Sequence, residues 1–158
     1  MLKKIVIISC IVVMLIILSK IVDDNIKEDA SIPNVNKETL EYFRKNYKED
    51  IITCAEEDLN NDGKKDLVVI YKKSNNSNEM VVVVSDKNSH YITKPIPAPI
   101  ENQTITFKNI DDKAPIEVIV SGSKNGNVGY AIYRVEGKKF VDYLAKIWTN
   151  VAKNKNNT

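Results

Sequence analysis

The chain has 158 residues, of which 43% are hydrophobic and 28% are charged, and its formal net charge is +2. These values are ordinary for a globular protein, and the length predicts a single domain. The charge is uneven: residues 23–66 carry thirteen acidic and seven basic side chains, whereas residues 124–158 carry two acidic and seven basic. The basic part has no dense stripe of lysine and arginine with interleaved aromatic residues, which argues against nucleic-acid binding.

An apolar segment at the N-terminus predicts a membrane anchor. Two lysines precede a stretch, 5–18, that contains neither a charge nor a proline, and Lys20 follows close to its end. About 21 residues rising roughly 1.5 Å each just cross ~30 Å of hydrocarbon, with Lys20 reaching the far headgroups. The first two lysines favour a cytoplasmic N-terminus. Residues 1–22 are therefore predicted to be a single-pass anchor in the cell membrane, with residues 23–158 outside.

Two alternatives for this segment stay open. A cleaved signal peptide requires small residues before the cleavage site, and the apolar run has no such pair. Residues 7–10 resemble a bacterial lipobox, which would be lipidated at Cys10, but eight apolar residues follow that cysteine. Cys10 lies within the predicted membrane segment and Cys54 in the outer domain, so the two cannot form a disulfide. Cys54, in an apolar run, is predicted to be a small buried hydrophobic residue.

The segment after the anchor is predicted to be a stalk followed by a helix. Residues 23–36 are rich in Asp, Asn and Lys, and Asn36 is a favourable N-cap. Leu40, Phe43 and Tyr47 then recur at helical spacing. This pattern predicts a short amphipathic helix that covers part of a sheet.

From residue 51 the pattern changes to short β-rich runs separated by polar turns. The predicted strands are 51–57, 66–72, 79–85, 90–93, 104–108, 116–121, 129–135 and 139–143. A shift of 51 residues places 66–69 on 117–120 and 80–84 on 131–135, which indicates a duplicated unit. Each unit is predicted to be a four-stranded antiparallel meander. The two sheets would pack face to face, or side by side like propeller blades, with residues 94–99 as an extended proline-rich linker.

The C-terminal segment completes the predicted fold. Residues 142–153 carry apolar side chains at helical spacing, which predicts a short closing helix, and residues 151–158 are predicted to be disordered. The fold class is therefore mainly β, with an N-terminal transmembrane helix and one or two short amphipathic helices. Residues 37–150 form the predicted extracytoplasmic β domain.

The strongest chemical signal is an acidic loop at residues 58–66. Oxygen-bearing side chains stand at loop positions 1, 3, 5 and 9, and Gly63 stands at position 6, where a positive φ is needed to turn the chain back. Calcium takes six to eight oxygen ligands, and a tight loop of alternating Asp and Asn can supply them. The predicted ligands are Asp58, Asn60, Asp62, the carbonyl of Lys64, and Asp66.

This motif resembles the loop of EF-hands, and more closely that of FG-GAP/VCBS-type β-propeller repeats, because a β-rich run stands on each side. The resemblance implies that the loop carboxylates bind calcium. Val69 occupies the position of the bidentate glutamate of an EF-hand, which excludes the helix-loop-helix form. The second unit, at residues 109–117, lacks the glycine and has Lys113 at position 5.

Two interpretations of the loop compete. One is a hairpin turn at residues 61–63 that is decorated with solvated acids. The other is a structural calcium site, favoured because three carboxylates within nine residues repel one another without a cation. Its dissociation constant is expected to be on the order of 10⁻⁴–10⁻³ M, as in extracellular modules.

A second resemblance spans more of the chain. Residues 97–103, 107–112, 121–124 and 129–132 are similar to the small anchored bacterial SaoC family of Cys-Cys-COOH (seleno)proteins. This chain ends in Asn-Asn-Thr at residues 156–158. The terminal thiol or selenol chemistry that the family implies therefore has no residue to carry it here.

These features predict a non-enzymatic, membrane-anchored, extracytoplasmic domain that is stabilised by calcium and has a binding or structural role toward a protein or envelope component. The alternative is an accessory subunit of a membrane redox or transport system, for which Cys54 is the available thiol. An enzyme would require the carboxylates of residues 58–66 to line a pocket. His90 is the sole histidine, so a zinc site or a Ser-His-Asp triad has no support, and it is predicted to lie on a strand surface.

Overall fold

The computed structural model describes residues 13, 14, 32–87, 89–124 and 126–142, and the chain divides into two units, residues 1–30 and 31–158. Of the first unit it describes Val13 and Met14, which are helical and exposed. Among the described residues, none of the helices has the length and hydropathy needed to span a bilayer. The predicted anchor, apart from these two residues, and the predicted closing helix and tail lie outside the described residues.

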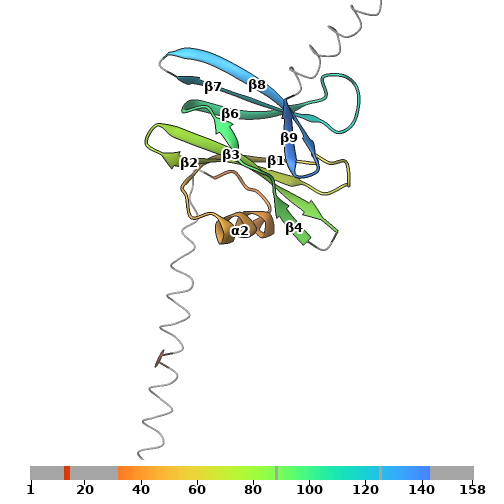
Figure 1. Ribbon diagram of the computed structural model, residues 1–158. Coiled ribbons are helices and arrows are strands. Elements are labelled where there is room, and N and C mark those ends of the chain that lie inside the picture. Colours follow the sequence, from red (N-terminus) through yellow and green to blue (C-terminus); the bar gives the residue numbers. More distant parts are fainter. Residues whose placement is uncertain (1–12, 15–31, 88, 125, 143–158) are drawn as a thin grey trace, which may run out of the picture. The chain divides into compact units, whose positions relative to one another are not determined.

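The second unit consists of one helix and two antiparallel sheets in its described part (Figure 1). Sheet A has the strand order β1-β2-β3-β4, with β5 also paired to β3, and sheet B has the order β6-β7-β8-β9. The prediction of a mainly antiparallel β fold is confirmed. In chain order the elements are α2 (Lys37–Asn46), β1 (Ile51–Glu57), β2 (Asp66–Ser74), β3 (Ser77–Asp86), β4 (Ser89–Ile92), β5 (Ile96–Ala98), β6 (Glu101–Lys108), β7 (Glu117–Lys124), β8 (Asn127–Glu136) and β9 (Lys139–Asp142).

Helix α2 begins where the sequence predicts. The side chain of Asn36 accepts a hydrogen bond of 2.8 Å from the backbone N–H of Glu38, which satisfies one of the free donors of the first turn. Glu38 in the first turn and Arg44 and Lys45 in the last turn complement the helix dipole. The helix ends at Tyr47, which is extended, so the predicted amphipathic helix is confirmed.

Two apolar cores separate three layers, in the order α2, sheet A, sheet B (Figure 1). Successive side chains of a strand point to opposite faces, and β2 and β3 are buried on both of theirs. The core between α2 and sheet A contains Phe43, Cys54, Leu67, Val69, Tyr71, Val81 and Val83. The core between the two sheets contains Leu59, Val68, Ile70, Met80, Val82, Val84, Val118, Val120 and Val135.

The two sheets turn equivalent faces in the same direction. Under the shift of 51 residues, Leu67 and Val69, which face α2, correspond to Val118 and Val120, which face sheet A. Each sheet therefore directs the same side of its second strand toward the layer that precedes it in the chain. The two sheets therefore pack face to face, and the face of sheet B that contacts sheet A is equivalent to the face of sheet A that contacts α2.

The predicted alignment of the third strands is wrong by one residue. Val68 pairs with Val82 in sheet A, and its counterpart Ile119 pairs with Ile132 in sheet B, so the third strands correspond by a shift of 50. The difference arises in the first hairpin, where the register shifts between Lys72 and Ser74. That bulge inserts one residue that the β7–β8 hairpin does not have.

The proline-rich segment between the two sheets is extended, as predicted, and part of it is also a strand of sheet A. Ile96–Ala98 forms strand β5, in which Pro97 is opposite Glu79 of β3. Proline lacks the N–H that a central strand donates, so it is tolerated here because β5 lies at the sheet edge. Strands β4 and β5 together pair along successive halves of β3.

The end of the predicted stalk also belongs to the packed region. Ile32 and Val35 contact the core beneath α2. The N–H of Asn36 donates a hydrogen bond of 2.6 Å to Glu56 of β1. The predicted boundary at residue 36 thus lies inside the packed unit, which begins at residue 31.

We expect Phe43→Ala to lower the free energy of unfolding by about 3–5 kcal/mol, because it opens a cavity in the fully buried core between α2 and sheet A. Urea unfolding followed by circular dichroism measures the change. Glu41→Ala, on the exposed side of the same helix, is the matched control and is expected to shift stability by less than about 0.5 kcal/mol. An equal effect of both substitutions would contradict the layered packing.

Candidate metal centre

The acidic loop connects β1 to β2 and is folded by two left-handed residues. Asn61 has a φ of 61° and Gly63 a φ of 84°, so the backbone reverses twice within three residues. Asparagine and glycine are the residues that adopt this conformation most readily. A side chain on Gly63 would meet no neighbour within 4 Å, so its φ alone explains the glycine.

The first three predicted ligands are brought together by hydrogen bonds to the loop backbone. Asp58 accepts from the N–H of Asp62 at 3.2 Å and from the N–H of Gly63 at 2.8 Å. Asn60 accepts from the N–H of Asp62 at 3.0 Å and donates its amide to the Asp62 carboxylate at 3.0 Å. The Asp62 carboxylate also accepts from the N–H of Lys64 at 2.9 Å. These bonds hold the oxygens on one tight turn.

The fourth predicted side-chain ligand has a different position. Asp66 is fully buried, and its two carboxylate oxygens accept from the N–H of Leu59 at 3.0 Å and from the N–H of Ser85 at 2.9 Å. Burial raises the pKa of Asp66 to about 6; the two N–H groups lower it, and the negative charges of Asp62 and Asp58 raise it further. Asp66 thus joins the loop to β3.

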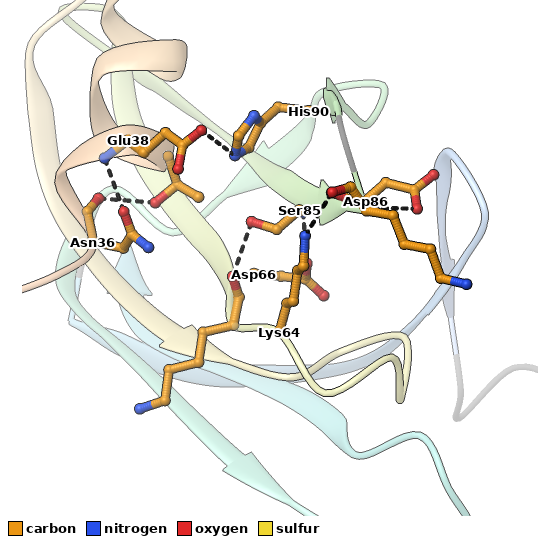
Figure 2. A network of polar contacts seen from close by, with 10 residues as sticks. Asn36, Glu38, Lys64, Asp66, Ser85, Asp86 and His90 are labelled. Carbon is orange, nitrogen blue, oxygen red and sulfur yellow. Dashed lines mark hydrogen bonds and ion pairs between the residues drawn. The ribbon is translucent and has the colours of Figure 1, made fainter.

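The fifth predicted ligand is the carbonyl of Lys64, and the side chain of this residue reaches across to the end of β3 (Figure 2). Its Nζ donates to the carbonyls of Asp86 at 2.9 Å and Lys87 at 3.1 Å, in the turn between β3 and β4. Beside it, the Ser85 hydroxyl donates to the carbonyl of Lys65 at 3.1 Å.

A polar groove runs between this turn and the N-terminus of α2. Among its lining residues are Glu38, Lys64, Ser85 and His90, whereas Asp58, Asp62 and Asp66 do not line it. The loop carboxylates are therefore engaged with backbone amides and do not face this groove.

The residues fit a cation loop in part. The left-handed turn and the grouping of Asp58, Asn60 and Asp62 suit a small cation, and each carboxylate oxygen that accepts one hydrogen bond keeps a second lone pair. Within the described ranges, however, no three acidic, histidine or cysteine side chains converge as ligands. Asp66 in particular is committed to two amides. Cation binding here would use the oxygens of positions 1, 3 and 5 first.

The loop of sheet B has the same local geometry despite its different sequence. Glu117 accepts from the N–H of Ile110 at 2.9 Å, as Asp66 does from Leu59, and each pair is seven residues apart. Asp111 accepts from the N–H of Lys113 at 3.1 Å, as Asn60 does from Asp62.

The left-handed residue of this turn recurs as well. Asp112 has a φ of 56°, and Asn61 lies 51 residues before it in the first loop. Three features of the two loops therefore correspond under one shift of 51 residues. The sequence indicated that the two segments correspond, but not that the second loop has this geometry with Ala114 at the position of Gly63.

The two other candidate residues, Cys54 and His90, pack against neighbouring side chains of the domain. Cys54 is 2% exposed, as predicted, and burial raises the pKa of its thiol to about 11. His90 lies on β4, where its ring contacts that of Tyr42 with centroids 5.3 Å apart, and its Nε2 is 4.0 Å from Glu38. The buried thiol of Cys54 is therefore poorly placed to react as a nucleophile.

Comparisons of the chain with protein-family models, with curated proteins and with solved structures gave no match.

The raised pKa of Asp66 predicts a pH dependence of stability. Because the folded-state pKa of about 6 lies above the ordinary value of an aspartate, 3.8, the folded protein binds this proton more tightly than the unfolded chain. The contribution is complete below the unfolded value and is lost as the pH rises toward the folded value. We expect Asp66 to reduce the free energy of unfolding by at most about 3 kcal/mol across this window.

Urea unfolding of the wild type and Asp66→Asn, in EDTA from about pH 4 to about pH 7, measures this slope. Asp66→Asn is expected to remove the pH dependence, because asparagine does not titrate. It should also lower stability at acidic pH, because its NH₂ group would face a backbone N–H donor in place of an acceptor oxygen. Asp62→Asn, which is exposed, serves as the control; it removes one of the smaller causes of the raised pKa of Asp66 and should keep most of the slope. Parallel curves for all three proteins would show that Asp66 titrates normally.

Proposed function

We propose that the chain is a membrane-anchored, extracytoplasmic, non-enzymatic domain whose first loop binds calcium as a structural ion. The observation that carries the proposal is the loop itself. Asp58, Asn60 and Asp62 are wrapped onto one turn by their own backbone amides, at the junction of two strands of the central sheet. A cation at this turn would offset the repulsion of the acids and tie β1 to β2.

The same geometry supports a structural role over catalysis. A catalytic carboxylate must reach a substrate, and a catalytic metal needs an open coordination position. The loop acids accept bonds from the chain's own amides, and they do not line the neighbouring polar groove.

A binding role is supported by an apolar area on sheet B. Val128 is 83% exposed and Tyr130 is 66% exposed, both on the half of β8 that has no partner on its outer edge among the described strands. Exposed apolar side chains on an open sheet edge are typical of interaction surfaces. The partner is proposed to be a protein or envelope component.

The alternative, an accessory subunit of a membrane redox or transport system, has less support in its redox form. Thiol chemistry needs an accessible thiolate, and Cys54 is buried with a raised pKa. The transport form stays a prediction.

We expect millimolar calcium to raise the melting temperature of the wild-type chain by several degrees over its value in EDTA. Calcium at about ten times its dissociation constant adds about 1.4 kcal/mol of stability, which is enough to shift the melting temperature of a domain of this size by several degrees. The double variant Asp58→Ala/Asp62→Ala should not respond. Magnesium, which prefers strict octahedral geometry and holds its water, is the control ion. If calcium does not change the melting temperature of the wild type, the loop is a hairpin turn and the calcium proposal fails.

The anchor is tested by fractionation. We expect the full chain to sediment with membranes and a chain without residues 1–22 to be released into the soluble fraction. Protease added to intact cells whose outer envelope has been opened should digest the domain if residues 23–158 lie outside. Protection of the domain from that protease would contradict the proposed orientation.

A further inference from the structure

The second loop contains a cation that belongs to the protein. Arg134 of β8 places its guanidinium against two acids of this loop: one nitrogen is 2.9 Å from Asp111 and also contacts Glu117. Glu117 is fully buried, and the Arg134 side chain is 13% exposed. A buried carboxylate without a counter-charge is strongly destabilising, so this guanidinium is the charge that allows Glu117 to be buried while ionised.

The two acids that Arg134 joins correspond to predicted cation ligands of the first loop. Under the shift of 51 residues Asp111 corresponds to Asn60, at position 3, and Glu117 to Asp66, at position 9. Arg134 thus bridges the counterparts of position 3, which the first loop is expected to use for its ion, and of position 9, the buried carboxylate beside it.

The first loop has no such residue. Val84 pairs with Tyr91 as Arg134 pairs with Val141, so Val84 is the counterpart of Arg134 under the shift of 50 that applies to the third strands. Val84 is apolar and fully buried between the sheets. Sheet A therefore has a carboxylate at position 9 and no side-chain cation opposite it, whereas sheet B has both.

We propose that the second loop is a cation site whose occupant is the Arg134 guanidinium. This side chain takes the place that a metal ion from solution would otherwise have beside the carboxylates of sheet B. The complementary statement, that the first loop takes its cation from solution because Val84 supplies none, rests on the proposed function. Removal of the guanidinium should leave Asp111, Glu117 and the neighbouring loop oxygens as a set of hard ligands suited to calcium.

The test measures bound calcium per chain by equilibrium dialysis with radioactive calcium, on the full chain in a non-ionic detergent. We expect Arg134→Gln to bind one more calcium ion per chain than the wild type. The readout is the difference in bound calcium between the two proteins. A wild type that binds no calcium would refute the calcium loop of residues 58–66, but it would leave the proposal for the second loop intact. Equal stoichiometry in the two proteins would overturn it.

Thermal melts give a second readout in a background that silences the first loop. In Asp58→Ala/Asp62→Ala, adding Arg134→Gln should lower the melting temperature in EDTA by roughly 10 °C, and millimolar calcium should recover part of the loss. Arg134→Lys keeps the charge and should melt close to the background, without a calcium response.

If the Arg134→Gln protein is unfolded in EDTA, folding on addition of calcium supports the proposal. A chain that stays unfolded with and without calcium contradicts it, because the ion then fails to replace the guanidinium.

Discussion

The fold depends on a buried carboxylate at the start of the second strand of each sheet. Asp66 and Glu117 each accept a hydrogen bond from an amide seven residues earlier, which fixes the return of the loop. Asp66 also bonds Ser85 of β3, so one side chain joins three segments of sheet A. A backbone amide buried in such a junction must be paired, and a carboxylate with two acceptor oxygens can pair two of them at once. The loop geometry follows from this constraint.

The order and orientation of the layers follow from the correspondence between the two sheets. Because the loops and second strands of the two sheets are equivalent, the side of sheet B that faces sheet A corresponds to the side of sheet A that faces α2. The opposite side of sheet B corresponds to the side of sheet A that is buried between the sheets. On that side Ile132 is 8% exposed and Tyr130 is 66% exposed, so sheet B carries apolar side chains on a side that no described layer covers.

The sequence predicted the elements better than their registration. Asn36 and the helical spacing located α2, and alternating or continuous apolar runs located eight strands, because caps and periodicity are local properties. Strand β5 was missed because Pro97 argues against a central strand and nothing local shows that it lies at an edge. The third strands were misaligned by one because the bulge at Lys72–Ser74 leaves no distinctive sequence signal. The acidic loop was evident from its spacing, yet the burial of Asp66 depends on Ser85, which is 19 residues away.

The two units differ in how they make a buried carboxylate tolerable. In sheet B the charge is kept and paired with Arg134, at the cost of desolvating both ions. In sheet A the opposite residue is Val84, and burial raises the pKa of Asp66 to about 6 although two backbone amides stabilise its charge. At neutral pH the Asp66 carboxylate is ionised, and it lies beside the negative charges of Asp58 and Asp62. In the described part of sheet A, no arginine at the position of Val84 offsets the repulsion among these three carboxylates. The cation proposed for the first loop would be the physical counterpart of Arg134 in the second, because Val84 supplies no charge at the corresponding position of the third strand.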